Sequence, residues 1–276
     1  KGKSSPIVGV VGSGSFGTAI VKMLLENSKK VHWCVRNEFV KGAIELRGHN
    51  PNYLTSVSFD IKKLALTTDV NELVSACDVV VLATPSIYLS ETIEKMTCNY
   101  EGKLFVSAIK GIVPKHNDVV AHYLRDVFKI GFRSQAVIAG PCHAEEVAME
   151  RLSYLTIATA EKENSELLKT LFSSDYIRVK CSTDILGNEY SAILKNVYAI
   201  GAGIASGLGY GDNFQAVFVS NAIREMELFL DAVYPEKRDV NETAFLGDLL
   251  VTAYSLFSRN RNLGNLIGKG YTVKSA

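Results

Sequence analysis

Short apolar runs alternate with amphipathic segments through the first two-thirds of the chain. Runs at 7–11, 31–37, 78–86, 104–108, 136–139, 155–159 and 176–180 are typical of strands. The run over 78–86 is almost wholly apolar and closes at a proline, as strands buried on both faces of a parallel sheet do. Segments 19–25, 68–77 and 161–172 have helical spacing, whereas 41–65 is polar and is expected to be irregular. This alternation predicts a doubly wound α/β domain.

The pattern changes after residue 184, beyond which no run is typical of a strand. Segments 185–206 and 212–233 have long apolar stripes at helical spacing, and shorter helices are expected over 242–256 and 258–268. We therefore predict a Rossmann-type domain over 1–183 and an all-helical domain over 184–276.

Three glycines follow the first apolar run in the spacing G-x-G-x-x-G, and a helical pattern begins directly after them. Gly12 would make the tight turn, Gly14 would let the backbone approach a pyrophosphate, and Gly17 would let the helix pack on the strand. The N–H groups and the dipole at the helix start favour phosphate. A glycine-rich turn that binds no ligand can have the same sequence pattern, but the strand–turn–helix context favours a dinucleotide site.

The second strand leads to Arg36, at a position where NAD-specific folds usually carry an acidic residue for the ribose 2′-hydroxyl. A cation at this position suits a 2′-phosphate, which favours NADP(H). The alternative is that Arg36 is a solvated surface side chain, and Glu38 two residues later keeps NAD(H) open.

Composition and charge exclude several classes of function. The 30 basic and 29 acidic residues leave a net charge of +1, which argues against nucleic acid as a partner. The five cysteines are scattered without a C-x-x-C spacing, so neither a disulfide framework nor a metal site is expected. No apolar run approaches the about 18 residues of a membrane span, and Lys1–Pro6 lead into the first strand without a signal-peptide core. A cytoplasmic protein is therefore expected.

A nucleotide-binding domain followed by a helical domain suggests a dehydrogenase with its cleft between the two. Hydride transfer at a carbonyl carbon requires a group that protonates or deprotonates the oxygen. Lys195 lies inside an apolar helical segment, where burial would lower the pKa of a lysine toward the range of an acid–base catalyst. A lysine that reaches solvent from a half-exposed helix has the same spacing. The other candidates are Lys110, Glu189, Asp248 and, as a weaker rival, His143.

A second polar cluster stands near the end of the chain. Ser258 fits a helix N-cap, and Arg259 and Asn260 would then be donors in the first turn. Such a cluster could clamp a phosphate, because arginine offers a bidentate fork at a positive helix end. An ordinary basic surface helix fits the composition equally well.

Seven motifs in this order resemble the bacterial-type NAD(P)-dependent sn-glycerol-3-phosphate dehydrogenases over nearly the whole chain. The motifs are Gly12–Ala19, Lys110–Gly111, Gly140–Pro141, Leu194–Val197, Gly207–Asn213, Leu246–Leu249 and Ser258–Arg261. The resemblance implies reversible conversion of dihydroxyacetone phosphate and NAD(P)H to glycerol 3-phosphate, which feeds phospholipid synthesis. It also implies a homodimer.

The resemblance assigns a role to each matching residue. Lys195 would be the general acid for the ketone oxygen, Asp248 would hold and tune it, and Asn196 would be a supporting polar residue. The substrate would be bordered by Gly140 and Cys142 and bound by Lys110, and its phosphate would be held by Ser258, Arg259 and Asn260. The cofactor would be touched by Ser15, Phe16, Arg36, Lys110, Ala144 and Arg259, beside the three glycines.

The sequence departs from the family pattern in two places. Cys142-His143 stands where the family commonly has a hydroxyl residue and Phe, which argues against a side-chain hydrogen bond from position 142. The chain ends at Ala276, whereas family members usually continue, and a glutamate in that continuation normally touches the cofactor. We therefore expect a chain truncated at its C-terminus.

Two other functions fit the same architecture. A reductase similar to ketopantoate reductase also pairs a nucleotide-binding domain with a helical domain that carries a lysine, but its carboxylate substrate does not require Ser258-Arg259-Asn260. A non-catalytic NADP(H)-sensing protein would need neither Lys195 nor Asp248.

Overall fold

A computed structural model describes residues 5–276, which divide into two compact units. Unit 1 holds the chain through Ile138 and then Cys142–Ile185, and unit 2 holds Ala139–Pro141 and Leu186–Ala276. The predicted domain boundary after residue 183 lies two residues before the end of Cys142–Ile185. Residues 1–4, which are part of the segment on which the expectation of no signal peptide rests, lie outside the described residues.

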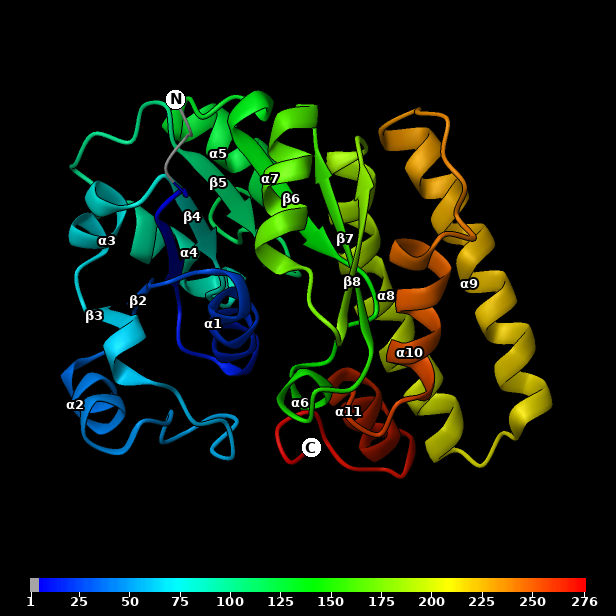
Figure 1. Ribbon diagram of the computed structural model, residues 1–276. Helices are drawn as coiled ribbons and strands as arrows, with labels where there is room; N and C mark the ends of the chain where they lie inside the picture. The colour runs from blue at the N-terminus through cyan, green and yellow to red at the C-terminus, as the bar shows by residue number, and fades with distance from the viewer. Residues whose placement is uncertain (1–4) are drawn as a thin grey trace. The chain divides into compact units, whose positions relative to one another are not determined.

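An eight-stranded sheet forms the centre of unit 1, in the order β3-β2-β1-β4-β5-β6-β7-β8 (Figure 1). The order reverses at β1, so the carboxyl ends of β1 and β4 form the switch point at which such sheets bind ligands. All the pairs from β3 through β1 and β4 to β6 are parallel, as is β7–β8. The strands are β1 (Val8–Val11), β2 (Val31–Cys34), β3 (Leu64–Thr67), β4 (Val79–Leu82), β5 (Leu104–Ser107), β6 (Gln135–Ala139), β7 (Ser153–Thr159) and β8 (Ile177–Ser182).

Two separate apolar cores cover the two faces of this sheet. Val79 and Val81 belong to one core and Val80 and Leu82 to the other, because successive side chains of a strand point to opposite faces. The first core contains side chains from α1 (Ser15–Asn27), α2 (Glu38–Arg47), α6 (Ala144–Ala148) and α7 (Lys162–Phe172). The second contains side chains from α3 (Val70–Ala76), α4 (Ser86–Ile93) and α5 (Val120–Phe128). The predicted doubly wound α/β fold is confirmed.

The expectation of irregular structure over 41–65 is wrong. Helix α2 continues to Arg47, a 3-10 turn covers Ile61–Lys63, and β3 begins at Leu64. Asn37 caps α2 by accepting a hydrogen bond from the Val40 N–H at 3.0 Å, and Gly48 ends the helix with φ +70°. Only Val40 and Ile44 of α2 are buried, so the helix has too few apolar positions for a visible stripe.

Unit 2 is helical, as predicted. Its elements are α8 (Ile185–Gly207), which starts at the last residue of unit 1, α9 (Asp212–Val233), a π-helical turn (Thr243–Gly247), α10 (Asp248–Tyr254) and α11 (Arg259–Gly268). The single helix expected over 242–256 is therefore a π-helical turn that leads directly into α10. Tyr198, Met226, Leu230 and Phe245 are among the buried side chains of its core. Among residues 5–276, none of the helices combines the length and the apolar character that a bilayer crossing requires.

Helices α8 and α11 meet backbone against backbone, at glycines on both sides. A Cβ added at Gly203 would lie 2.1 Å from the carbonyl oxygen of Arg261, and one at Gly264 would lie 2.1 Å from that of Ile200. Gly207 and Gly268 repeat this contact one turn later, so the two helices run in the same direction where they touch. Any side chain at these positions would push the helices apart.

We expect Gly264→Ala to lower the free energy of unfolding by about 1–3 kcal/mol, because its methyl group would overlap a main-chain carbonyl that cannot move aside. Urea unfolding followed by circular dichroism measures this change. Gly42→Ala is the control, since Gly42 also lies inside a helix, α2, and no atom lies within 4 Å of its added Cβ. Equal stabilities of the two variants would contradict the close contact between α8 and α11.

Candidate active site

The glycine turn of unit 1 leaves one of its faces open. Gly12 has φ +122°, and a Cβ there would lie 2.6 Å from the carbonyl oxygen of Ala83 at the end of β4. A Cβ at Gly17 would lie 2.4 Å from the carbonyl oxygen of Gly12, so the first turn of α1 packs tightly on the loop. At Gly14 nothing lies within 4 Å of the added Cβ. This space lets a pyrophosphate approach the backbone, so the turn fits a dinucleotide.

Lys110 lies beside the start of α1. Its ammonium stands 5.1 Å from the centroid of the Phe16 ring, which is a cation–π contact. The next residue, Gly111, packs so closely on α4 that an added Cβ would lie 2.7 Å from the Ser86 hydroxyl. Three of the predicted residues, Ser15, Phe16 and Lys110, thus gather at the carboxyl ends of β1, β4 and β5.

Arg36 stands two residues after β2, and its backbone N–H donates to the Ser13 hydroxyl at 3.2 Å. Its side chain is exposed. Glu38, the acidic residue that kept NAD(H) open, accepts a hydrogen bond from Thr68 at 2.6 Å and pairs with Lys41 at 3.7 Å. Arg36 is thus an exposed residue whose backbone contacts the turn, whereas the carboxylate of Glu38 is already hydrogen-bonded.

The predicted residues between 140 and 144 differ in their surroundings. Gly140 has φ +103° and belongs to unit 2. Cys142 and Ala144 are 5% and 6% exposed and belong to an apolar core of unit 1. His143 is the residue directly before α6, which is only five residues long.

A buried ion pair joins α8 to α10 in unit 2. The ammonium of Lys195 contacts the Oδ1 carboxylate oxygen of Asp248, and their side chains are only 5% and 2% exposed. Lys195 thus does not reach solvent, which answers the question that its spacing left open. Within residues 5–276, no group donates a hydrogen bond to the other oxygen of Asp248, Oδ2. A charged donor held next to a buried carboxylate can deliver a proton at one fixed place.

Asn196 and Glu189 lie on α8 with Lys195. The amide of Asn196 donates to the carbonyl oxygen of Ala192 at 3.1 Å, so this nitrogen faces along its own helix. Glu189 is 1% exposed. The structure brings Lys195 and Asp248 together, and it places Asn196 on the same helix as Lys195.

The predicted N-cap at Ser258 is present. Its hydroxyl oxygen accepts a hydrogen bond from the Arg261 N–H at 3.3 Å, and α11 begins at Arg259. Arg259 is exposed and Asn260 is half-buried in this first turn, which contains no acidic residue. A cation and an amide at a positive helix end are suited to hold a phosphate.

Two histidines and two cysteines outside these clusters pack against other side chains of unit 1. His122 Nδ1 lies 2.9 Å from the carboxylate of Asp118, and the His116 ring packs on Tyr123 with centroids 4.6 Å apart. Burial raises the pKa of the Cys34 and Cys77 thiols to about 12, so neither is a nucleophile near neutral pH. The described part of the chain contains no group of three or more His, Cys, Asp or Glu residues that could hold a metal ion.

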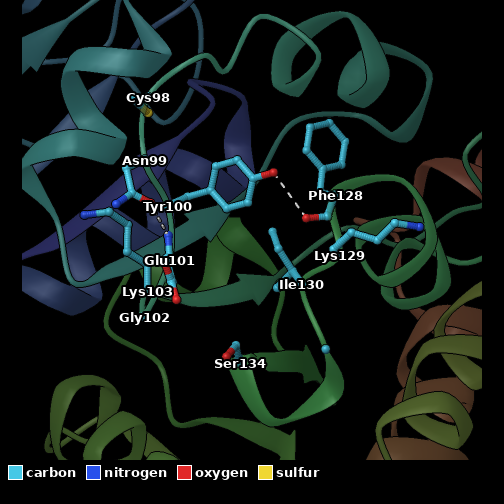
Figure 2. Close-up of a pocket in the computed structure, with 11 residues that line it drawn as sticks. Cys98, Asn99, Tyr100, Glu101, Gly102, Lys103, Phe128, Lys129, Ile130 and Ser134 are labelled. Carbon is cyan, nitrogen blue, oxygen red and sulfur yellow. Dashed lines mark hydrogen bonds between the residues drawn. The ribbon is translucent and has the colours of Figure 1, made fainter.

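A surface pocket of about 530 Å³ lies at the amino ends of β5 and β6 (Figure 2). It is lined by residues 98–103, which precede β5, and by residues 128–131 and Ser134, and it contains none of the predicted site residues. Tyr100 donates to the carbonyl oxygen of Phe128 at 3.2 Å within it. Because β1, β4 and β5 are parallel, this pocket and the glycine turn lie at opposite ends of the strands.

Sequence reasoning missed Asn50, Thr18 and Trp33, which all hydrogen-bond the glycine turn. Asn50 is fully buried but stands in a polar loop, and it contacts Ser13, 37 residues away. No local pattern signals such a contact. A buried tryptophan in a strand is also ordinary core, so its indole N–H could not be assigned a partner.

Comparisons with known proteins agree with this geometry. Models of the N- and C-terminal parts of NAD-dependent glycerol-3-phosphate dehydrogenase match residues 7–165 and 184–276. A protein of Syntrophomonas wolfei named glycerol-3-phosphate dehydrogenase (NAD(P)+) is 35% identical over 272 residues, which cover 98% of this chain and 79% of that relative. The crystal structure of glycerol-3-phosphate dehydrogenase from Coxiella burnetii has a TM-score of 0.89 and 25% identity, covering 98% of this chain and 82% of the other.

A ketopantoate reductase of Ralstonia eutropha shares the fold alone, with a TM-score of 0.62 and 18% identity over 96% of this chain and 86% of the other. The two family models together cover most of the chain, and the Syntrophomonas relative aligns over nearly the whole length of this chain. This chain belongs to the NAD-dependent glycerol-3-phosphate dehydrogenase family.

Proposed function

We propose that this protein catalyses the reversible, NAD(P)H-dependent reduction of dihydroxyacetone phosphate to sn-glycerol 3-phosphate. The family match names this activity in its relatives. The observation that carries the proposal for this chain is the buried ion pair between Lys195 and Asp248, because it holds a proton donor where water cannot compete.

Reduction of a ketone requires a hydride on the carbon and a proton on the oxygen. The bound nicotinamide cofactor supplies the hydride. The ammonium of Lys195 donates its proton to the carbonyl oxygen as negative charge develops there, and in the reverse direction the neutral amine takes the alcohol proton. The carboxylate of Asp248 holds the ammonium in place and balances its charge. Asn196 supports this pair on α8.

The substrate phosphate binds at the start of α11 in this proposal. Arg259 offers its guanidinium fork, Asn260 its amide and Ser258 a capped first turn. Lys110 contributes a second cation, and Gly140 and Cys142 border the substrate through their backbone. A dianionic phosphate needs such a concentration of donors, whereas an uncharged hydroxyl at the same place does not.

For the cofactor, we propose that the turn from Gly12 to Gly17 binds the pyrophosphate and that Ser15, Phe16 and Ala144 contact the dinucleotide. Arg36 faces the adenosine ribose, and its charge favours NADP(H) over NAD(H). Arg259 and Lys110 also touch the cofactor in this assignment. The family match supports NAD(H) or NADP(H) as the cofactor.

The test measures the oxidation of NADPH from its loss of absorbance and compares dihydroxyacetone phosphate with dihydroxyacetone as the substrate. Turnover of the phosphate ester alone would support both the reaction and the phosphate site, and a repeat with NADH would measure the contribution of Arg36. Turnover of ketopantoate instead would overturn the substrate. NADPH binding without turnover of any carbonyl compound would favour the NADP(H)-sensing alternative.

Three further features are part of the proposal. A homodimer is expected by resemblance, and sedimentation equilibrium would test it.

All five cysteines are free, which suits the reducing cytoplasm. The product carries the glycerol phosphate unit of phospholipids, so we propose that the enzyme supplies glycerophospholipid synthesis.

A further inference from the structure

The carbonyl groups of the glycine turn, Gly12–Gly17, accept hydrogen bonds from neighbouring side chains and from the first turn of α1. The carbonyl oxygen of Gly12 accepts a hydrogen bond from the indole N–H of Trp33 at 2.9 Å. The carbonyl oxygen of Gly14 accepts two, from the hydroxyl and from the backbone N–H of Thr18, each at 2.9 Å. The Gly12–Ser13 and Gly14–Ser15 peptide groups are thereby fixed in orientation.

Asn50 holds the carbonyl group between these two. Its amide nitrogen donates to the carbonyl oxygen of Ser13 at 3.0 Å and to the hydroxyl of Thr18 at 2.8 Å. Its amide oxygen accepts from the N–H groups of Asn52 and Tyr53 at 2.9 and 3.3 Å. The side chain is 0% exposed. Both amide protons and both lone pairs are therefore used, so Asn50 has one possible orientation.

Because the peptide bond is planar, fixing each carbonyl group also fixes the direction of the N–H group in the same peptide. In a trans peptide the C=O and the following N–H point in opposite directions, and the described chain has no cis peptide bond. The N–H groups of Ser13, Gly14 and Ser15 therefore point away from Trp33, Asn50 and Thr18. Among residues 5–276, none accepts a hydrogen bond from these three N–H groups.

We propose that Asn50 is a positioning residue for the cofactor pyrophosphate. It fixes the peptide between Ser13 and Gly14 so that the Gly14 N–H faces the open side of the turn, where nothing lies within 4 Å of the added Cβ. Through Thr18 it also braces the next peptide, which carries the Ser15 N–H. The inference rests on the proposed function insofar as it takes the turn to be the site of the pyrophosphate.

Asn50→Leu keeps the size of the side chain and removes its hydrogen bonds. We expect its Kd for NADPH, measured by fluorescence titration, to rise about tenfold or more, because hydrogen bonds to a charged group lose their orientation. Gln135→Leu is the matched control: Gln135 is 1% exposed, and its amide donates to the carbonyl oxygens of Ala121 and Ile130 at 3.1 and 2.6 Å. Both variants should melt at a lower temperature, and only Asn50→Leu should lose affinity for NADPH.

A second pair of variants keeps the test decisive if Asn50→Leu does not fold. Thr18→Val removes the hydroxyl between Asn50 and Gly14 at nearly constant volume, and Thr18→Ser restores a hydroxyl. Weakened NADPH binding in Thr18→Val with recovery in Thr18→Ser would support the proposal. Unchanged NADPH affinity in both Asn50→Leu and Thr18→Val, despite lower melting temperatures, would overturn it.

A fragment separates the pyrophosphate from the adenosine end. Binding of 2′-AMP, which contains no pyrophosphate, should be nearly the same in the unsubstituted protein and in Asn50→Leu. Equal weakening for 2′-AMP and NADPH would overturn the assignment, because Asn50 would then act through the loop that carries Asn52 and Tyr53. Failure of the unsubstituted protein to bind NADPH or NADH would instead overturn the cofactor site itself. This outcome is distinguishable because it is measured on the unsubstituted protein, before any variant is compared.

Discussion

Lys195→Met is expected to lower the turnover of dihydroxyacetone phosphate by about 10²–10⁴-fold, the contribution typical of a positioned general acid. Methionine fills a similar volume but carries no proton for the ketone oxygen. The Kd for NADPH should stay nearly unchanged, since the glycine turn and Arg36 belong to unit 1 and Lys195 to unit 2. Steady-state rates and a fluorescence titration measure the two quantities. A rate close to that of the unsubstituted protein would remove Lys195 from the mechanism.

Loss of stability has to be separated from loss of chemistry in this variant. Removing Lys195 leaves the buried carboxylate of Asp248 without its cation, which should lower the free energy of unfolding by about 3–5 kcal/mol. The double variant Lys195→Met/Asp248→Leu contains no buried charge at this place and should recover most of that stability. It should remain inactive. Activity that returned together with stability would mean that the ion pair serves folding alone.

Arg259→Ala is expected to raise the KM for dihydroxyacetone phosphate by about 10–100-fold. A hydrogen bond to a charged group contributes about 1.5–3 kcal/mol, and each 1.4 kcal/mol is a factor of about ten. The value of kcat/KM for unphosphorylated dihydroxyacetone, where measurable, should change far less, because that substrate has no phosphate for the guanidinium. Initial rates over a range of each substrate measure the difference.

Lys269→Ala is the matched control, because it removes one positive charge from the other end of α11. Its KM for dihydroxyacetone phosphate should stay within about twofold of the unsubstituted value, since charges at an exposed surface are screened by salt. Because Arg259 is also assigned to the cofactor, the Kd for NADPH must be measured in the same variant. An unchanged KM in Arg259→Ala would argue against a phosphate site at the start of α11.

Local pattern was sufficient for much of the fold and for the glycine turn. The buried strands of the sheet appear as apolar runs, because both faces of each strand are covered. The spacing of Gly12, Gly14 and Gly17 can be recognised in the sequence because each position has a local reason to lack a Cβ: close backbone contacts at Gly12 and Gly17, and open space at Gly14. Helix α2 was missed because only two of its side chains are buried, and a stripe needs more.

The candidate site required contacts that the sequence does not display. The spacing around Lys195 fits a buried and an exposed lysine equally, and the choice depends on Asp248 in another helix. Asn50 stands in a polar loop, and its partners Ser13 and Thr18 lie 37 and 32 residues away. Resemblance to a family supplied the role of Lys195, whereas only the structure indicated a role for Asn50.

The glycine contact between α8 and α11 also has a consequence for how this protein can change over generations. Every amino acid other than glycine carries a Cβ, so no substitution at Gly203, Gly207, Gly264 or Gly268 leaves the two backbones where they are. Mutations that alter the helical unit must therefore accumulate on its other faces. Helix α8, which carries Lys195, and helix α11, which carries Arg259, are therefore inherited as a pair, and change is expected in the side chains around them.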